Sequence, residues 1–288
     1  MTAITNITRC LIIWRNNKDM NTMKFYNSVA EFSAALDGEI INTYCKRGHG
    51  ISVWSKYSLK SYAGVESIDE AKELLLKGDS INAAKIRAEG EIIKPQEGHN
   101  PILKSAVVGC LPNVPNYLRG VPAQMFQIKN NSRKRPIINI YIEVTVADST
   151  DLAKLVQKAA VISNAIAATE LSGYRVNLFA VYGVKNAKEY CAGFCVNIKE
   201  ADSPLNLLNI AFPLLNPAFS VVLGADWVDK NIKTSMRVGR YVYGCVLHSE
   251  EIQRVFGING LFFSLREMIR KDDNTDSVCK KINEYLAK

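Results

Sequence analysis

The chain has 288 residues, of which 22% are charged and 48% hydrophobic. This composition is typical of a globular protein and excludes disordered, collagen-like and disulfide-dense classes. The formal net charge is +8, and residues 1–136 carry 19 Lys or Arg against 12 Asp or Glu, whereas residues 137–288 carry 17 against 16. We therefore expect any anionic partner to bind the first half of the chain.

The seven cysteines are scattered along the chain and odd in number. Such usage is typical of a reducing compartment, where most cysteines are small buried apolar side chains. A structural zinc site would need a second close pair of Cys or His besides Cys191 and Cys195, and the sequence lacks one. The apolar run at residues 10–14 is too short for a signal-peptide core. We expect a cytoplasmic protein.

Residues 1–94 are expected to form a small, basic and mainly helical region. Rough alternation over residues 51–64 predicts a short strand or hairpin. Ser67 and Glu70 form a capping-box pattern at the start of one helix. Helical spacing of apolar residues, with Gly or Asp-Gly as a stop, predicts helices at residues 24–36, 67–78 and 80–90.

Residues 95–136 are rich in proline and glycine. Pro112, Pro115 and Pro122 stand too close together for a regular helix or a central strand. The apolar residues between them favour an ordered loop that packs on the body of the protein over a free linker. We expect a proline-rich bridge here.

The pattern changes at residue 137 and predicts an α/β domain over residues 137–288. A run of β-branched and aromatic residues at 137–146 predicts a strand buried on both faces. A long helix at 151–173 and a second buried strand at 174–183 follow, which favours a crossover between parallel strands. Further strands are predicted at 190–198, 220–226 and 240–248, and further helices at 205–215, 260–271 and 277–288. This alternation predicts an α/β sandwich with a mostly parallel sheet.

The longest charge-free stretch runs from Ser203 to Ala225 and is long enough to cross a membrane. Pro213 and Pro217 interrupt it, so a continuous lipid-facing helix is not expected. A buried helix followed by a buried strand explains the stretch better, and we expect no membrane partner.

A buried strand followed by a polar loop and a long helix resembles the start of a von Willebrand factor A-like (vWA-like) domain, a Rossmann-like sandwich. That family carries a metal-binding Asp-x-Ser-x-Ser motif where this chain has Glu-Val-Thr-Val-Ala at residues 143–147. The strand that begins at Gly173 also resembles the second strand of that fold. The resemblance covers residues 137–270.

Two segments extend the resemblance. The proline-rich segment at 107–126, with its Val-Pro, Gly-x-Pro and Met, follows an upstream Gly64-x-x-Ser67 and Glu70-Ala71 pattern. Together with a vWA-like C-terminal half, these are similar to a group of uncharacterised bacteriophage proteins. The resemblance implies a non-enzymatic phage or prophage protein whose vWA-like domain serves as a protein-binding or assembly platform. It would present the loop at 143–148 to a phage or host protein.

The same resemblance suggests a degenerate metal site. Glu143 and Thr145 offer hard oxygen ligands suited to Mg²⁺, whereas Ala147 offers none. Asp148 lies out of register with the motif, and Asp226, at the end of the predicted strand 220–226, is the candidate for a more distant ligand. The alternative for Asp148-Ser149-Thr150 is simple capping of the following helix.

Basic clusters favour a second interpretation, nucleic-acid binding in phage DNA or RNA metabolism. Phosphate contact is expected from six side chains, namely Lys46, Arg47, Lys129, Arg133, Lys134 and Arg135. The aromatic residues of 54–62 could stack on bases. The alternative is a solvated loop that keeps the protein soluble, since no helix-turn-helix, zinc-finger or RNP signature is present.

Motifs of catalysis are missing from the sequence. It has no phosphate-binding loop, no Gly-x-Gly-x-x-Gly after a strand, no Gly-x-Ser-x-Gly and no His-Glu-x-x-His. The Cys-His neighbours, Cys245 with His248 and Cys45 with His49, are too close in sequence for a typical nucleophilic pair. We expect binding without a catalytic role and without a cofactor other than Mg²⁺.

Overall fold

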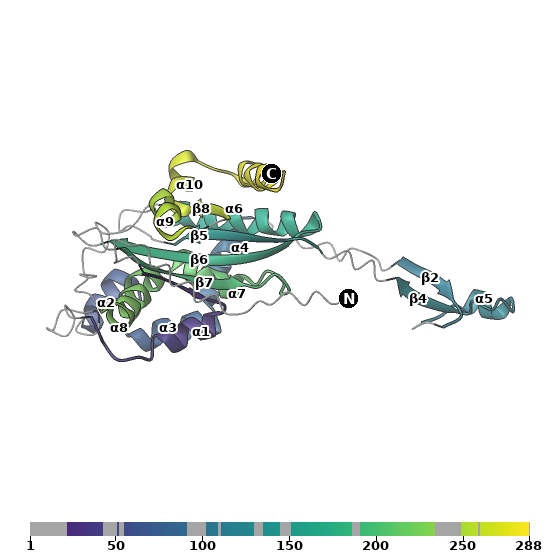
Figure 1. Cartoon of the computed structure of the whole chain (residues 1–288), viewed down its shortest axis with the longest axis horizontal. Coiled ribbons are helices and arrows are strands. Elements are labelled where there is room, and N and C mark those ends of the chain that lie inside the picture. The colour runs from purple at the N-terminus through teal and green to yellow at the C-terminus, as the bar shows by residue number, and fades with distance from the viewer. Residues whose placement is uncertain are drawn as a thin grey trace.

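The computed structural model describes residues 22–42, 51, 55–90, 102–108, 111–129, 135–144, 151–185, 191–233, 249–258 and 260–287 (Figure 1). Its larger sheet has five strands in the order β1-β7-β6-β5-β8. Their bounds are Thr22–Tyr26 for β1, Cys191–Lys199 for β7, Arg175–Lys185 for β6, Ile137–Glu143 for β5 and Leu261–Ser264 for β8.

Strand pairing makes this a mixed, mostly parallel sheet. β5 pairs in parallel with β6 and with β8, and β1 pairs in parallel with β7, while β6 and β7 are antiparallel. The predicted crossover is confirmed, because β5 leads into the 20-residue helix α6 (Leu152–Leu171) and then into β6. The α/β fold class is confirmed with it.

Alternate residues of the strands face two hydrophobic clusters. Ile138, Ile140 and Ile142 of β5 join the larger core, which α6 and most of the other helices cover. Tyr141 joins a smaller cluster on the opposite face with Ile252 of helix α9 (Ser249–Phe256). The other helices of the C-terminal half are α7 (Leu207–Leu215), the π-helix η3 (Phe219–Leu223), α8 (Gly224–Asn231), α10 (Leu265–Lys271) and α11 (Thr275–Leu286).

The described residues of the N-terminal region form β1 and four helices, α1 (Val29–Ala35), α2 (Lys56–Ala63), α3 (Ile68–Lys77) and α4 (Ser80–Ala88). Two predictions were wrong here. The single helix expected at 24–36 is strand β1 followed by α1, because β1 gains a partner in β7 and the Ser28 side chain caps a new helix by accepting from the Glu31 amide. The hairpin expected at 51–64 is α2, capped in the same way by Ser55.

The predicted boundary between residues 94 and 137 does not separate two cores. Phe32 and Ile86 from the N-terminal region lie in the same hydrophobic core as Ile140 of β5. Buried Asp229 of α8 also binds this region by hydrogen bonds. Its side chain accepts from the Ile51 amide at 3.1 Å, and its backbone carbonyl accepts from the amides of Ile41 and Asn42.

Two C-terminal predictions were wrong, and a third lies outside the described residues. The strand expected at 220–226 is the buried η3 and the start of α8. A continuous apolar run fits a fully buried helix as well as a buried strand, so periodicity could not decide. The helix expected at 260–271 begins only at Leu265, after strand β8, and the strand expected at 240–248 lies outside the description.

In the described part of the chain, no single helix is long and apolar enough to cross a membrane. Two consecutive helical segments, Leu207–Leu215 and Phe219–Asn231, are together long and apolar enough to cross one, but the chain bends by 69° between them. Both halves of this pair are buried in the larger core.

The proline-rich bridge folds into a second, smaller sheet rather than a loop. β2 (Ile102–Ala106) and β3 (Leu111–Pro112) both pair in antiparallel fashion with β4 (Met125–Lys129), and a short helix α5 (Val114–Leu118) follows β3. The expectation of a loop was wrong, because Pro112 ends a strand at the edge of this sheet and Pro115 lies in the first turn of the short helix α5, where no amide donor is lost.

We call residues 102–129 the arm. Figure 1 shows it apart from the larger sheet. Among the arm residues whose burial is described, 105–108 and 112–125, none belongs to either hydrophobic cluster.

Candidate functional site: the sheet edge and the projecting arm

The first position of the predicted metal motif lies at the carboxyl end of β5. Glu143 is 3% exposed, opposite Ser264 of β8 and Val181 of β6 in the strand register. The pKa of Glu143 is raised to about 7, mainly by burial and to a smaller degree by the charge of Glu267. A hydrogen bond with Ser264 and the charge of Arg266 oppose the rise. The carboxyl group is therefore poised between its protonated and ionised forms near neutral pH.

Asp226 does not follow a strand, as the prediction of a distant ligand required. Asp226 lies inside α8, is 1% exposed and forms an ion pair with Lys230 at 2.9 Å. Burial raises its pKa, and the bond to Lys230 opposes the rise. The charge of Lys72 also lowers the pKa of Asp226, and that of Asp37 raises it. The predicted pairing of Asp226 with the motif depended on the strand at 220–226, which is a helix.

Thr145 and Asp148 lie outside the described residues, so the Mg²⁺ site stays a prediction. Among the described residues, no group of three His, Cys, Asp or Glu side chains could hold a metal ion. The capping expected from residues 148–150 is performed by Asp151, whose side chain accepts from the Ala153 amide at 3.0 Å.

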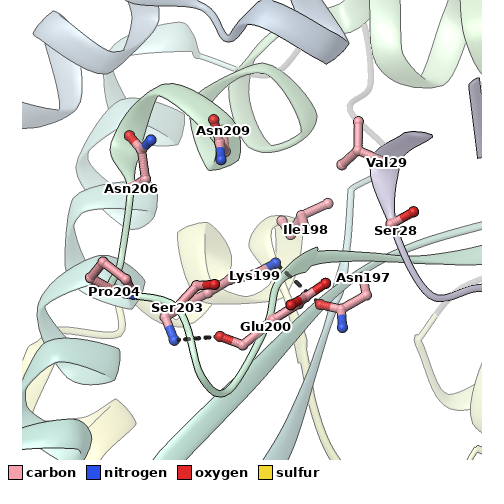
Figure 2. Close-up of a pocket in the computed structure, with 10 residues that line it drawn as sticks. All are labelled: Ser28, Val29, Asn197, Ile198, Lys199, Glu200, Ser203, Pro204, Asn206 and Asn209. Atoms are coloured by element: carbon pink, nitrogen blue, oxygen red, sulfur yellow. Dashed lines mark hydrogen bonds between the residues drawn. The ribbon is translucent and has the colours of Figure 1, made fainter. Parts of the chain in front are cut away.

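A polar pocket of about 260 Å³ lies where β7 ends, between the starts of α1 and α7 (Figure 2). Its polar side chains hold the fold together. Asn206 accepts from the Leu208 amide at 3.0 Å and Ser28 from the Glu31 amide at 3.1 Å. The buried ammonium of Lys199 is paired with Glu170 at 2.5 Å. The Lys199 charge is thus neutralised within the protein, and the other charged residue that lines the pocket is the exposed Glu200.

The tip of the arm, residues 107–108 and 112–121, exposes apolar side chains. Val108 and Leu118 are each 78% exposed, and Tyr117 is 65% exposed. Large apolar side chains that gather at one exposed place mark an interaction site, whereas single ones are ordinary. The exposed set at the tip is Val107, Val108, Val114, Tyr117, Leu118 and Val121.

The polar groups of the tip point inward instead. Asn113 is 5% exposed, and its amide group donates to the Ser105 hydroxyl at 3.0 Å. Its side-chain oxygen accepts from the Asn116 backbone amide at 3.3 Å, and the Asn116 side chain donates to the Ala123 carbonyl at 2.9 Å. The tip therefore reverses the usual arrangement, with amides satisfied inside and aliphatic groups outside.

All charged residues of the segment 101–136, which contains the arm, are positive. Residues 101–136 contain six Lys or Arg and no Asp or Glu, whereas residues 1–100 and 137–288 each have a net charge of +1. Three quarters of the net charge of the chain thus lies in 36 residues. Arg119 at the tip and Arg135 just beyond the arm are exposed.

For the other predicted phosphate contacts, the structure describes a backbone position or nothing. Lys129 ends β4, opposite Ile102, and the description covers its backbone only. Lys46, Arg47, Arg133 and Lys134 lie outside the described residues.

Sequence reasoning missed the tip. The prolines suggested a loop packed on the body, and the apolar residues between them were interpreted as buried. The signal that could have identified the arm is the complete lack of acidic residues over 101–136. The regions on either side carry both charges, and packing a loop on the body gives no reason to exclude Asp and Glu.

Comparison with known proteins identifies a family. Residues 14–288 match the family described as a domain of unknown function, DUF7192. No curated protein and no solved structure matches the chain. Because the match spans both the arm and the α/β body, the chain belongs to the DUF7192 family.

Proposed function

We propose that this protein binds nucleic acid through the arm and acts without catalysis. The observation that carries the proposal is a run of 36 residues, 101–136, with six Lys or Arg and no acidic residue. Three of the six, Lys104, Arg119 and Lys129, lie in the arm, which Figure 1 shows apart from the larger sheet. Phosphate groups attract such a segment and repel carboxylates. The rest of the chain, at +1 on either side, lacks this bias.

The arm suits contact with a phosphate backbone. An antiparallel ribbon fits a groove of duplex DNA. The register places Lys129 at the end of the ribbon away from the tip, opposite Ile102, and Lys104 at the middle of the ribbon, opposite Gln127. Arg135 follows within a few residues. We call Lys104, Lys129 and Arg135 the base of the arm.

The experiment is fluorescence anisotropy with a labelled 30-base-pair duplex over a series of salt concentrations. We expect log Kd to depend steeply on log salt, and the triple variant Lys104→Gln/Lys129→Gln/Arg135→Gln to lower that slope by roughly three. The matched control removes three exposed charges of the body, Arg87→Gln/Lys233→Gln/Lys280→Gln. Equal slopes in the two variants would contradict a role for the arm.

A second candidate function is the protein-binding or assembly platform of a phage or prophage, built on a vWA-like body. The exposed apolar tip favours it, since such patches also mark protein interfaces. The order β5-α6-β6, with Glu143 at the carboxyl end of β5, is compatible with the vWA resemblance. In this case the partner is a phage or host protein.

A photo-crosslinking amino acid that replaces Tyr117, in protein produced and irradiated inside the cell, distinguishes the two candidate functions. A platform predicts an adduct whose added mass survives nuclease, and the nucleic-acid proposal predicts one whose added mass nuclease removes. The control is the same substitution at Tyr57, which is 83% exposed on the body. For the Mg²⁺ site, a thermal melt with and without magnesium is expected to shift to higher temperature if the ion binds the folded protein.

A further inference from the structure

We infer that the apolar tip of the arm is a wedge that enters between base pairs of duplex DNA, while the base of the arm contacts the phosphates. This inference rests on the proposed function and names both the form of nucleic acid and the role of the tip. It assigns a task to Val114 and Leu118, which phosphate binding alone leaves unexplained.

The distance between base and tip suits this task. β2 spans five residues, which corresponds to roughly 16 Å of extended strand. The register pairs Ile102 with Lys129 at one end of the ribbon and Ala106 with Met125 at the other, where the tip begins. The minor groove is only about 7.5 Å deep, so an arm whose base contacts the backbone can bring its tip to the base pairs.

The chemistry of the tip favours duplex over single-stranded nucleic acid. Proteins that bind single strands stack unpaired bases on aromatic side chains. Here Tyr117 is the one exposed aromatic residue among the described residues of the tip, and the others are Val and Leu. Aliphatic side chains of this kind unstack and kink a duplex when they enter a base step from the minor groove.

The tip is also held in shape before any contact. The Asn113 amide group bonded to Ser105 fixes α5 against β2, and the Asn113 backbone amide donates to the Gln124 carbonyl at 2.7 Å. Asn116 closes the segment that follows through the Ala123 carbonyl. A wedge must separate stacked bases, which costs a few kcal/mol per step, so it has to resist deformation itself.

Charge complementarity selects the occupant. Arg119 places a positive charge at the tip itself, and no acidic residue occurs anywhere in 101–136. The body of a second copy is a poor partner for this arm, because residues 1–100 and 137–288 are themselves slightly positive. A polyanion whose interior is apolar, as stacked base pairs are, satisfies both the charge and the exposed aliphatic surface.

The test uses a 30-base-pair duplex with 2-aminopurine at the centre, whose fluorescence rises when the base is unstacked. We expect the wild-type protein to raise the fluorescence. The double variant Val114→Ser/Leu118→Ser should lose most of that rise and bind roughly tenfold more weakly at 200 mM salt, where apolar contact dominates. Its salt slope should stay that of the wild type, because no charge has been removed.

The matched control removes two exposed apolar side chains of the body, Leu76→Ser/Ile81→Ser, which are 53% and 71% exposed. It should leave both the fluorescence and the affinity unchanged. Salt-dependent binding with no fluorescence change, or with equal effects of the two double variants, would overturn the wedge while leaving the proposed function intact. No binding to the duplex at all would overturn both.

Vesicles of phosphatidylcholine with phosphatidylglycerol form the third arm of the test, because an anionic membrane shares the charge and the apolar interior. If the tip variant loses sedimentation with these vesicles, and the duplex shows no unstacking with the wild type, the wedge is overturned in favour of lipid. Sedimentation that is equal for wild type and tip variant, together with tip-dependent unstacking, supports the wedge.

Discussion

At the scale of single residues, a buried hydrogen bond between Trp227 and Tyr26 joins helix α8 to strand β1. Trp227 is fully buried, and its ring nitrogen donates to the Tyr26 hydroxyl at 2.6 Å. Tyr26→Phe leaves this donor without its acceptor, and we expect a loss of about 1–3 kcal/mol in the free energy of unfolding. Urea unfolding measures it, with Tyr57→Phe at an exposed position as the control. Equal stability of the two variants would contradict this role.

Glu143 makes the stability of the fold depend on pH. Its pKa is about 7 in the folded protein and ordinarily 4.5, so the folded protein holds an extra proton between these values. Below about pH 4.5 the group is protonated in both states and does not lower the free energy of unfolding. Above about pH 7 it is ionised in both states, and its full destabilising effect is present. At about 1.4 kcal/mol per pKa unit, we expect the free energy of unfolding to fall by about 2–3 kcal/mol from pH 5 to pH 8 through this group.

Glu143→Gln should remove that fall, which urea unfolding at the two pH values would show. Glu89→Gln changes an exposed carboxyl group and should keep the wild-type difference. A wild-type difference in the Glu143→Gln protein as well would assign the pH dependence to other groups.

At the scale of elements, the contact of α3 with α7 depends on one glycine. Gly78 ends α3 with a φ of +91°, and a Cβ there would lie 2.9 Å from the Leu208 carbonyl oxygen. The next amide, that of Asp79, donates to the same carbonyl at 3.1 Å. Gly78→Ala adds backbone strain of about 1–3 kcal/mol to this clash, and a thermal melt should show a clear loss. Gly38→Ala has open space and should melt close to the wild type.

At the scale of the whole molecule, the arm and the body are separable in energy. Because none of the arm residues 105–108 and 112–125 belongs to either hydrophobic cluster, we expect that removing the arm takes away little that stabilises the body. The paired ends, Ile102 and Lys129, lie side by side, so a short Gly-Ser linker can replace residues 102–129. We expect a melting temperature within about 3 °C of the wild type and loss of salt-dependent duplex binding. A protein that no longer folds cooperatively would contradict the independence of the arm.

The central unit β5-α6-β6 was predictable from the sequence, since its length, its β-branched runs and the glycine stop at 173 all indicate the same elements. The candidate site was predictable only in part. Arg135 was identified from charge, but the tip residues Val114 and Leu118 were taken for buried ones. Apolar side chains near prolines look the same in sequence whether a partner or the protein itself covers them.

By itself, the amino-acid sequence determined the α/β class, the parallel crossover and the surplus of positive charge. These follow from local periodicity and composition, which no distant contact can alter. The tertiary structure alone decided that β1 joins β7, that 220–226 is a buried helix, and that the bridge is an arm with its amides inside. In each case the local pattern suits two states equally, and contacts with residues far along the chain, or their absence, select one.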